Sequence, residues 1–221
     1  AAKIAEMLLI VGLPFLGALL PVLFDRRGRL ATALAPLIAL SWLLWQAPRV
    51  FAGEVLVVSQ SWLPQLGFNL SLRLDGLGFL FALLILGIGL LVILYARYYL
   101  AEREPIGRFF SYLLLFMGAM LGVALADNLL LLLSFWELTS ISSFLLIGYW
   151  GERSASRQGA RMALAVTGAG GLCLLAGFLL LGDIAGSFSI PSVIAAREQV
   201  LADSRYPVLL VLILLGAFAK S

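Results

Sequence analysis

The stretch "DNLLLLLSFWELTSISSFLLIGYW", residues 127–150, begins with two polar residues and continues as an apolar run over 129–149. At 1.5 Å per residue, a helix of this length crosses the roughly 30 Å of hydrocarbon in a bilayer. Asp127 and Asn128 are both good helix N-caps, and residues 109–126 before them form another apolar run. The stretch therefore predicts two consecutive membrane helices joined by a two-residue break, with structural capping as the role of Asp127.

The composition of the whole chain indicates a membrane protein. Hydrophobic residues make up 62% of the 221 residues and charged residues only 12%, whereas a soluble domain carries about 25% charged residues. There is no histidine, and Cys173 is the single cysteine, so we expect no internal disulfide, metal or cofactor. The net charge of +3 comes mainly from arginines between apolar runs, which is typical of topology signals rather than of nucleic-acid binding.

Apolar runs of sufficient length predict an all-α polytopic fold with six complete transmembrane helices and a truncated seventh. The residues between the second and third runs differ, because every second residue over 68–74 is apolar, a period typical of a strand. The β-branched segment upstream can pair with it, so a short extracytoplasmic β-hairpin is expected at about 54–74. The second span is short and is expected to extend towards Val50. The predicted spans are 7–24, 30–45, 77–95, 109–126, 129–149, 162–181 and 207–221.

The positive charges predict how the chain is oriented. Nine arginines lie in the connections after the first, third and fifth spans, and five Lys and Arg lie on the other side. The richer side is cytoplasmic by the positive-inside rule, so the N-terminus, the hairpin and the connection 182–206 are expected outside. Clusters of small residues at 118–122 and 168–171 favour close packing between helices. The nine arginines are Arg26, Arg27, Arg29, Arg97, Arg103, Arg108, Arg153, Arg157 and Arg161.

Glu137 is an acid within the predicted span 129–149. It lies about 12 Å below the outer surface of the hydrocarbon, where an ionised side chain costs at least ~2.5–3.5 kcal/mol. Ser134 and Ser140 lie three residues to either side, so their hydroxyls are candidate supporting groups on the same face. A protonated glutamate kept for packing alone is one interpretation. A proton or cation translocation site is the interpretation we favour, because intramembrane acids commonly mark ion pathways.

Lys220 is a second charge at the end of an apolar run. It follows Pro207 by thirteen residues, which places it about 20 Å below the outer surface on a regular helix. It can be an interfacial lysine that extends to the cytoplasm, or a buried lysine that takes up and releases a proton. The depths of Glu137 and Lys220 differ by about 8 Å if both helices start level, so the sequence leaves their pairing open.

Three segments of the chain resemble a known family. "FWELTSISSFLLIGYW" (135–150), "GARMALAVTGAGGLCLLAGFLLLG" (159–182) and "GAFAKS" (216–221) are similar, in the same order, to the large A subunit of Mrp-type multisubunit cation/proton antiporters. The first motif is specific, and the resemblance covers essentially the whole chain. The antiporter-like proton-pumping subunits of respiratory complex I have the same fold but resemble this chain less around the glutamate.

The resemblance implies two inverted repeats of five helices. Residues 1–106 would be an N-terminal three-helix segment, and 107–221 the first part of one repeat, cut within its fourth helix. Glu137 and Lys220 would form the first charged pair of a proton path. The expected protein is a secondary transporter subunit rather than an enzyme. It would exchange Na⁺ for H⁺ in the cell membrane, together with other membrane subunits. The alternative is a proton-pumping subunit of an NADH:quinone oxidoreductase or hydrogenase-type complex, in which partners would handle the electrons.

Overall fold

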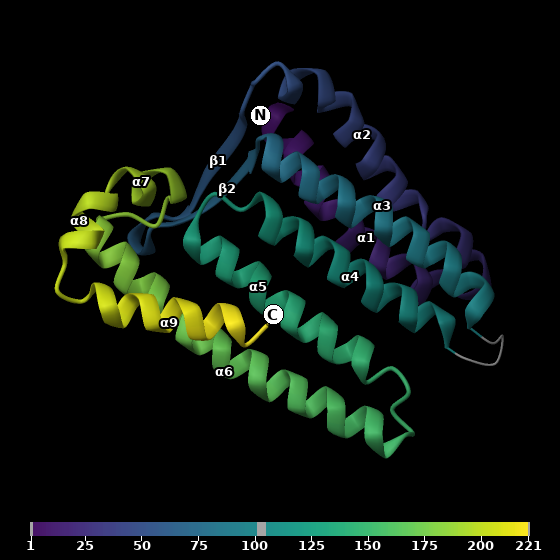
Figure 1. Cartoon of the computed structure of the whole chain (residues 1–221). Helices are drawn as coiled ribbons and strands as arrows, with labels where there is room; N and C mark the ends of the chain where they lie inside the picture. The colour runs from purple at the N-terminus through teal and green to yellow at the C-terminus, as the bar shows by residue number, and fades with distance from the viewer. Residues whose placement is uncertain (1, 101–104, 221) are drawn as a thin grey trace.

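The computed structural model describes residues 2–100 and 105–220, which form a bundle of helices and one two-stranded sheet (Figure 1). The elements are α1 (Ala2–Ala31), α2 (Leu34–Phe51), β1 (Leu56–Leu63), the short 3-10 helix η1 (Pro64–Leu66), β2 (Phe68–Leu74), α3 (Gly76–Tyr99), α4 (Ile106–Leu125), α5 (Leu129–Ile147), α6 (Ser154–Ala185), α7 (Ile190–Ala195), α8 (Arg197–Ala202) and α9 (Tyr206–Phe218).

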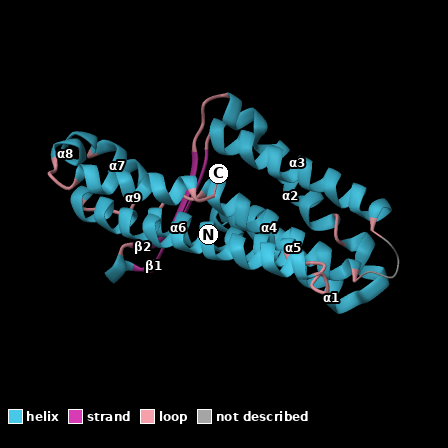
Figure 2. Ribbon diagram, turned by 60° about the horizontal axis from the view of Figure 1, so that its bottom comes forward, coloured by secondary structure: helices cyan, strands magenta, loops and turns pink. Residues whose placement is uncertain are grey.

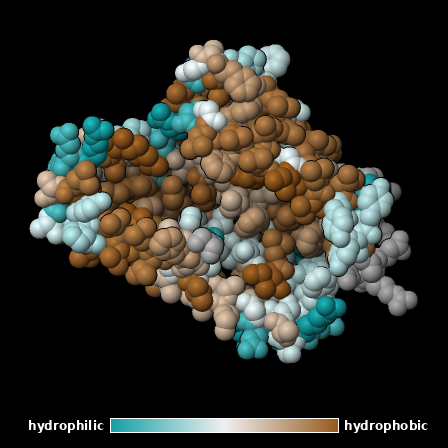
Figure 3. All heavy atoms as spheres, viewed as in Figure 1, coloured by the Kyte–Doolittle hydropathy of each residue, from teal (hydrophilic) through white to brown (hydrophobic). Residues whose placement is uncertain are grey.

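Five of these helices, α2 to α6, are long and apolar enough to cross a membrane. Helix α1 contains a shorter apolar run over Met7–Pro21, and α9 is itself a short apolar helix. Large apolar side chains such as Leu91 and Leu172 are 65% and 69% exposed. Figure 3 shows hydrophobic residues over the middle of the visible face and hydrophilic residues towards its ends. An apolar surface of this extent is suited to lipid, and the predicted helical membrane protein is confirmed for the described residues.

Three helices differ clearly in extent from the predicted spans. Helix α1 covers Ala2–Ala31, beyond the predicted 7–24 at both ends. Helix α6 begins at Ser154 and ends at Ala185, well beyond the predicted 162–181, because its first turns are polar and a hydropathy criterion does not detect them. Helix α2 covers Leu34–Phe51: it begins four residues after the predicted start at 30, and it ends close to Val50, towards which the predicted span 30–45 is expected to extend. The connection after α6 contains the short helices α7 and α8.

The hairpin predicted at about 54–74 is confirmed as a sheet. Strand β1 pairs antiparallel with β2, from Leu56 opposite Leu74 to Leu63 opposite Phe68. Leu72 and Leu74 of β2 are 1% and 0% exposed, whereas most of β1 is exposed. Figures 1 and 2 show the hairpin crossing the ends of the helices from the start of α3 towards α7, opposite the α5–α6 connection. The apolar positions on β2 therefore arise because one of its faces covers the bundle.

The break between α4 and α5 is held from both sides by backbone hydrogen bonds. The Asp127 N–H donates to the Ser71 carbonyl of β2 at 2.9 Å, and the Asp127 carbonyl accepts from the Ile190 N–H of α7 at 3.1 Å. The Leu129 N–H donates to the Phe188 carbonyl at 2.8 Å. Because a non-helical backbone needs partners wherever water is scarce, these bonds fix the point at which α5 enters the bundle.

Helix α5 is capped by Asn128, not by Asp127. The Asn128 Oδ1 accepts from the N–H groups of Leu130 and Leu131 at 3.0 and 3.3 Å, as an N-cap does. Its Nδ2 donates to the Gly67 carbonyl at the hairpin turn, at 3.0 Å. The predicted capping role of Asp127 is therefore wrong, because Asn128 holds the N-cap position with an extended backbone.

Helix α5 is packed between α4 and α6, and α9 packs on α6 (Figure 1). Small residues in α4 allow two close approaches. A Cβ on Gly118 would lie 2.8 Å from Cε2 of Phe15 in α1, and a Cβ on Gly122 would overlap the ring of Phe135 in α5. The close packing predicted for 118–122 is confirmed: Gly118 brings α4 close to α1, and Gly122 brings α4 close to α5.

Candidate functional site

Glu137 lies in the middle of α5 with its carboxyl group against α6. A Cβ placed on Gly171 of α6 would overlap Oε1 of Glu137 and would lie 2.7 Å from its Cδ. Oε1 is buried and has no hydrogen-bond partner among the described residues. A buried polar atom without a partner costs about 1–3 kcal/mol, so its retention points to a role beyond packing.

Lys220 follows α9, and its ammonium group binds α5. The Nζ donates to the Trp136 carbonyl and to Oγ of Ser140 at 2.9 Å each, and also to Oγ1 of Thr139. It lies 5.0 Å from the centroid of the Trp136 ring, within range of a cation–π interaction. An ammonium has three donors, and here all three have acceptors on α5. The Lys220 side chain therefore points towards α5 and does not extend away from the bundle as an interfacial lysine would.

Glu137 and Lys220 are neighbours without a direct ion pair. Within the residues that the structure describes, no ion pair of 4.0 Å or less joins them. The acid faces α6, whereas the lysine binds residues 136–140 of α5. The two side chains are half-buried, and the Lys220 ammonium binds the carbonyl of Trp136, the residue next to Glu137. The structure therefore places the two charged residues near each other without the direct pairing that the sequence leaves open.

The two candidate supporting serines have different surroundings. The Ser140 hydroxyl is buried and accepts from Lys220, so it supports the lysine. The Ser134 hydroxyl is exposed and donates to the Leu130 carbonyl of its own helix at 2.8 Å. Sharing a helix face with Glu137 is therefore not sufficient to bring a hydroxyl to the carboxylate.

Thr139 is a functional candidate that sequence reasoning missed. It is 1% exposed, its hydroxyl donates to the Trp136 carbonyl at 2.6 Å, and it accepts from Lys220. Four hydroxyl residues lie close together at 139, 140, 142 and 143 of an otherwise apolar helix. That clustering was the available signal, because hydroxyls in a membrane helix need partners.

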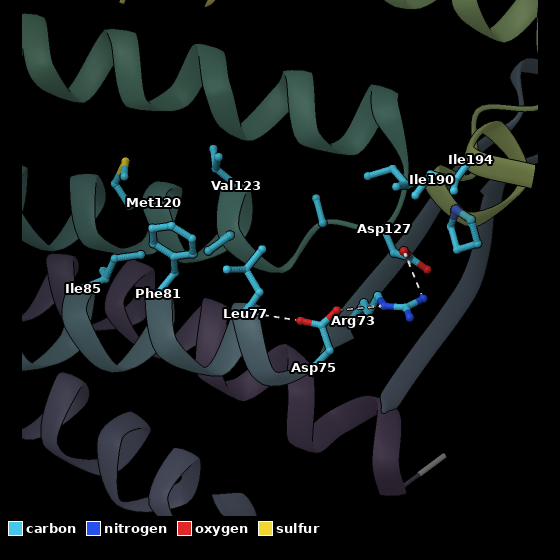
Figure 4. Close-up of a pocket in the computed structure, with 14 residues that line it drawn as sticks. Arg73, Asp75, Leu77, Phe81, Ile85, Met120, Val123, Asp127, Ile190 and Ile194 are labelled. Carbon is cyan, nitrogen blue, oxygen red and sulfur yellow. Dashed lines mark hydrogen bonds and ion pairs between the residues drawn. The ribbon is translucent and has the colours of Figure 1, made fainter. Parts of the chain in front are cut away.

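A separate cavity of about 780 Å³ opens where β2 meets α3, α4 and α7 (Figure 4). Its walls on α3 and α4 are apolar and include Phe81 and Met120, whereas Arg73, Asp75 and Asp127 lie at its hairpin end. The Arg73 guanidinium is 3.2 Å from the Asp75 carboxylate and 4.0 Å from that of Asp127. Arg73 therefore links the hairpin to the α4–α5 break.

The two acids beside Arg73 have opposite pKa shifts. A hydrogen bond of 2.9 Å from the Gly78 N–H, assisted by Arg73, holds the pKa of Asp75 below its usual value. Burial raises the pKa of Asp127, and the attraction of Arg73 only partly opposes this. Asp75 thereby stays charged as the N-cap of α3, and the cluster as a whole serves to fix the hairpin on the bundle.

The groups around Glu137 and Lys220 are an acid, an amine and hydroxyls, which take up and release protons or pass them on. Among the described residues, no group of three or more His, Cys, Asp and Glu is placed to hold a metal ion. The junction of α5, α6 and α9 is therefore a candidate site for moving a proton.

Known protein families match two parts of the chain. Residues 126–221 match "NADH:quinone oxidoreductase/Mrp antiporter, TM". Residues 62–110 match "NADH-Ubiquinone oxidoreductase (complex I), chain 5 N-terminus". The first match contains both Glu137 and Lys220, and the second contains β2 and α3.

Individual proteins are similar over most or all of the chain. The probable K⁺/H⁺ antiporter A/B subunit of Rhizobium meliloti (strain 1021) is 48% identical over 226 residues, covering 100% of this chain and 22% of that protein. The A1 subunit of the Na⁺/H⁺ antiporter of Staphylococcus haemolyticus (strain JCSC1435) is 50% identical over 170 residues, covering 77% and 21%. The structure of the Mrp complex from Dietzia sp. DQ12-45-1b matches with a TM-score of 0.83 at 31% identity, covering 100% of this chain and 24% of that one. The chain spans about a fifth of the length of these curated relatives.

Proposed function

The chain belongs to the NADH:quinone oxidoreductase/Mrp antiporter family of membrane proteins, as its motifs predicted, and we propose that it is the N-terminal portion of the A subunit of a multisubunit Na⁺/H⁺ antiporter. Such a subunit is a secondary transporter, not an enzyme. The observation that carries the proposal is Glu137, an acid in the middle of a membrane helix with its Oε1 atom buried against α6. A lysine ammonium bound to the same helix supports it.

In the proposed path, Glu137 takes up and releases a proton, and its proton affinity depends on the charge of Lys220. The lysine is held by a carbonyl and two hydroxyls of α5, so a change of its protonation also changes its attachment to that helix. Two titratable groups that interact strongly release their protons as a pair. A change at one of them is thereby passed on to the other.

The exchanged cation is proposed to be Na⁺. The two relatives differ in this respect, since one is named for K⁺/H⁺ and the other for Na⁺/H⁺ antiport. The alternative function, a proton pump driven by an NADH:quinone oxidoreductase or hydrogenase-type complex, draws on the complex I family that matches residues 62–110.

Transport by the complete complex in vesicles separates these functions. With a pH gradient imposed across the membrane, we expect added Na⁺ to dissipate it, and a parallel addition of K⁺ to have less effect. Protonophore-treated vesicles serve as the control for residual buffering. Proton movement that requires an electron donor and a quinone instead of a cation would favour the pump. A larger effect of K⁺ than of Na⁺ would show that K⁺ rather than Na⁺ is the exchanged cation.

We further propose an architecture and an orientation in the cell membrane. Helices α1 and α9 would also enter the membrane, giving six complete transmembrane helices and part of a seventh. Residues 1–106 would form an N-terminal segment, and a five-helix repeat would begin at 107. The other subunits of the antiporter would pack around them in the bilayer. Arg153 in the α5–α6 connection, with Arg157 and Arg161 in the first turns of α6, supports a cytoplasmic position for that end of the bundle, and hence an extracytoplasmic N-terminus and hairpin.

Two single cysteines test this orientation in a Cys173→Ser background. Gln65 at the hairpin tip and Glu152 in the α5–α6 connection are both exposed. On intact cells, an impermeant thiol reagent is expected to label Gln65→Cys but not Glu152→Cys, and opened cells should label both. The reverse pattern on intact cells would invert the proposed topology.

A further inference from the structure

Two adjacent glycines of α6 lie beside the two charged segments: Gly171 contacts Glu137, and Gly170 contacts Ala219, the residue before Lys220. Gly171 faces Glu137: a Cβ there would overlap Oε1, would lie 2.7 Å from Cδ and would be 3.2 Å from Oε2. All three distances are shorter than Cβ atoms normally allow, and the group in the way is the whole carboxyl. The carboxyl therefore occupies the space that a side chain at position 171 would fill.

Gly170 faces α9, immediately before Lys220. A Cβ on Gly170 would overlap the Cβ of Ala219 and would lie 3.4 Å from the Gly216 carbonyl. The contact is reciprocal, since a Cβ on Gly216 would lie 2.8 Å from the Gly170 carbonyl. Small residues let membrane helices approach backbone to backbone. Because Gly170 has no side chain, Gly216 and Ala219, which precede Lys220, can lie directly against α6.

Hydrogen bonds do not explain where the carboxyl of Glu137 lies. Its buried Oε1 has no partner among the described residues, whereas Lys220 has three acceptors on α5. The position of the acid is instead set by shape, through the opening at Gly171. We propose that Gly171 is a positioning residue for the proton-carrying carboxyl of Glu137, and that Gly170 does the same for the segment that carries Lys220. This inference rests on the proposed function.

Alanine substitutions in the complete, assembled complex test the proposal. Gly171→Ala is expected to lower exchange by about ten-fold or more, because misplacing a reacting group by about 1 Å can cost up to 100-fold. Gly170→Ala is expected to act in the same direction. Alanine is a better helix former than glycine, so a loss cannot come from a weaker α6.

The same helix offers two matched controls. A Cβ on Gly168 would meet nothing within 4 Å, so Gly168→Ala should exchange within about two-fold of the unchanged protein. Gly177 packs on α9 away from the charges, where a Cβ would lie 2.9 Å from Cγ1 of Ile213. Gly177→Ala therefore reports what tight packing alone contributes.

A second readout does not depend on exchange. Hydrophobic carbodiimides modify protonated carboxyls in apolar surroundings, and mass spectrometry gives the modification rate of Glu137. We expect Gly171→Ala to change this rate several-fold, and Gly168→Ala and Gly177→Ala to leave it unchanged. An unchanged rate in Gly171→Ala, or a loss of exchange in Gly177→Ala as large as in Gly171→Ala, would overturn the positioning role.

The two proposals fail in different ways. If Glu137→Gln is inactive while Gly171→Ala exchanges normally, the positioning role is wrong and the proposed function stands. If Glu137→Gln exchanges at the normal rate, the proposed proton path through Glu137 is wrong, and the positioning of a proton-carrying acid falls with it, whereas the antiporter function is overturned only if the unchanged complex shows no cation/proton exchange.

Discussion

Replacing Glu137 by glutamine is expected to lower cation/proton exchange by about 100-fold or more, because a positioned proton-transfer group typically contributes at least that factor. The amide has nearly the same shape as the carboxyl, so the contact with Gly171 is retained, but it cannot carry the proton. A neutral side chain is also easier to bury in a membrane helix, and assembly should therefore be preserved. The measurement is the Na⁺-induced dissipation of a pH gradient, normalised to assembled complex.

Glu152 provides the matched control for this substitution. It is an exposed acid in the connection after α5, so Glu152→Gln removes the same charge without touching the buried site. We expect it to exchange at the unchanged rate. A fully assembled Glu137→Gln complex that exchanges as fast as Glu152→Gln would show that the proton path does not use Glu137.

Local patterns predicted much of the fold. The apolar period over 68–74 indicated the hairpin, because the apolar side chains of Leu72 and Leu74 on β2 are buried against the bundle. The apolar runs located α3, α4 and α5 closely. The first turns of α6 were missed, since a polar helical extension outside the hydrocarbon lacks the apolar signal. The sequence could not tell whether Asp127 or Asn128 caps α5, because both residue types are good N-caps. The backbone geometry, which places Asn128 at the N-cap position, determines the cap.

The site was predictable in its parts but not in its assembly. The cost of placing a charge in the membrane was enough to single out Glu137 as a candidate. Its position along α5 followed from the rise per residue of a helix. The contacts of Lys220 with Thr139 and Ser140 join residues some eighty positions apart. Such contacts depend on how α9 crosses α6, which no local pattern encodes. The approach of Gly171 to the acid is equally invisible in the sequence, where 168–171 indicates only that some helix packs closely.

Replacing Lys220 by methionine is expected to impair exchange nearly as strongly as the loss of the acid. Methionine fills a similar volume but removes the charge and all three donors, so that the Trp136 carbonyl and the hydroxyls of Thr139 and Ser140 lose a partner. The Thr139 and Ser140 hydroxyls still donate to the Trp136 carbonyl, so no acceptor is left wholly without a partner, and thermal stability should be measured beside exchange to separate any structural loss. Arg197→Met is the control, because it neutralises an exposed basic residue on α8.

Whether the two charges act as one unit is tested with variants that keep the charges but move them. Glu137→Asp shortens the acid, and Lys220→Arg alters the geometry of the donors that bind α5. If the residues share a proton step, the loss caused by Glu137→Asp should depend on whether Lys or Arg is present at 220. The expected coupling is about 0.5–3 kcal/mol, as measured for residues of one network. The structure gives a reason to expect such coupling without an ion pair, since the lysine binds the helical turn that carries the acid. Losses that add in free energy, together with an unchanged pH profile in Lys220→Arg, would mean that Glu137 and Lys220 are separate stations of the path.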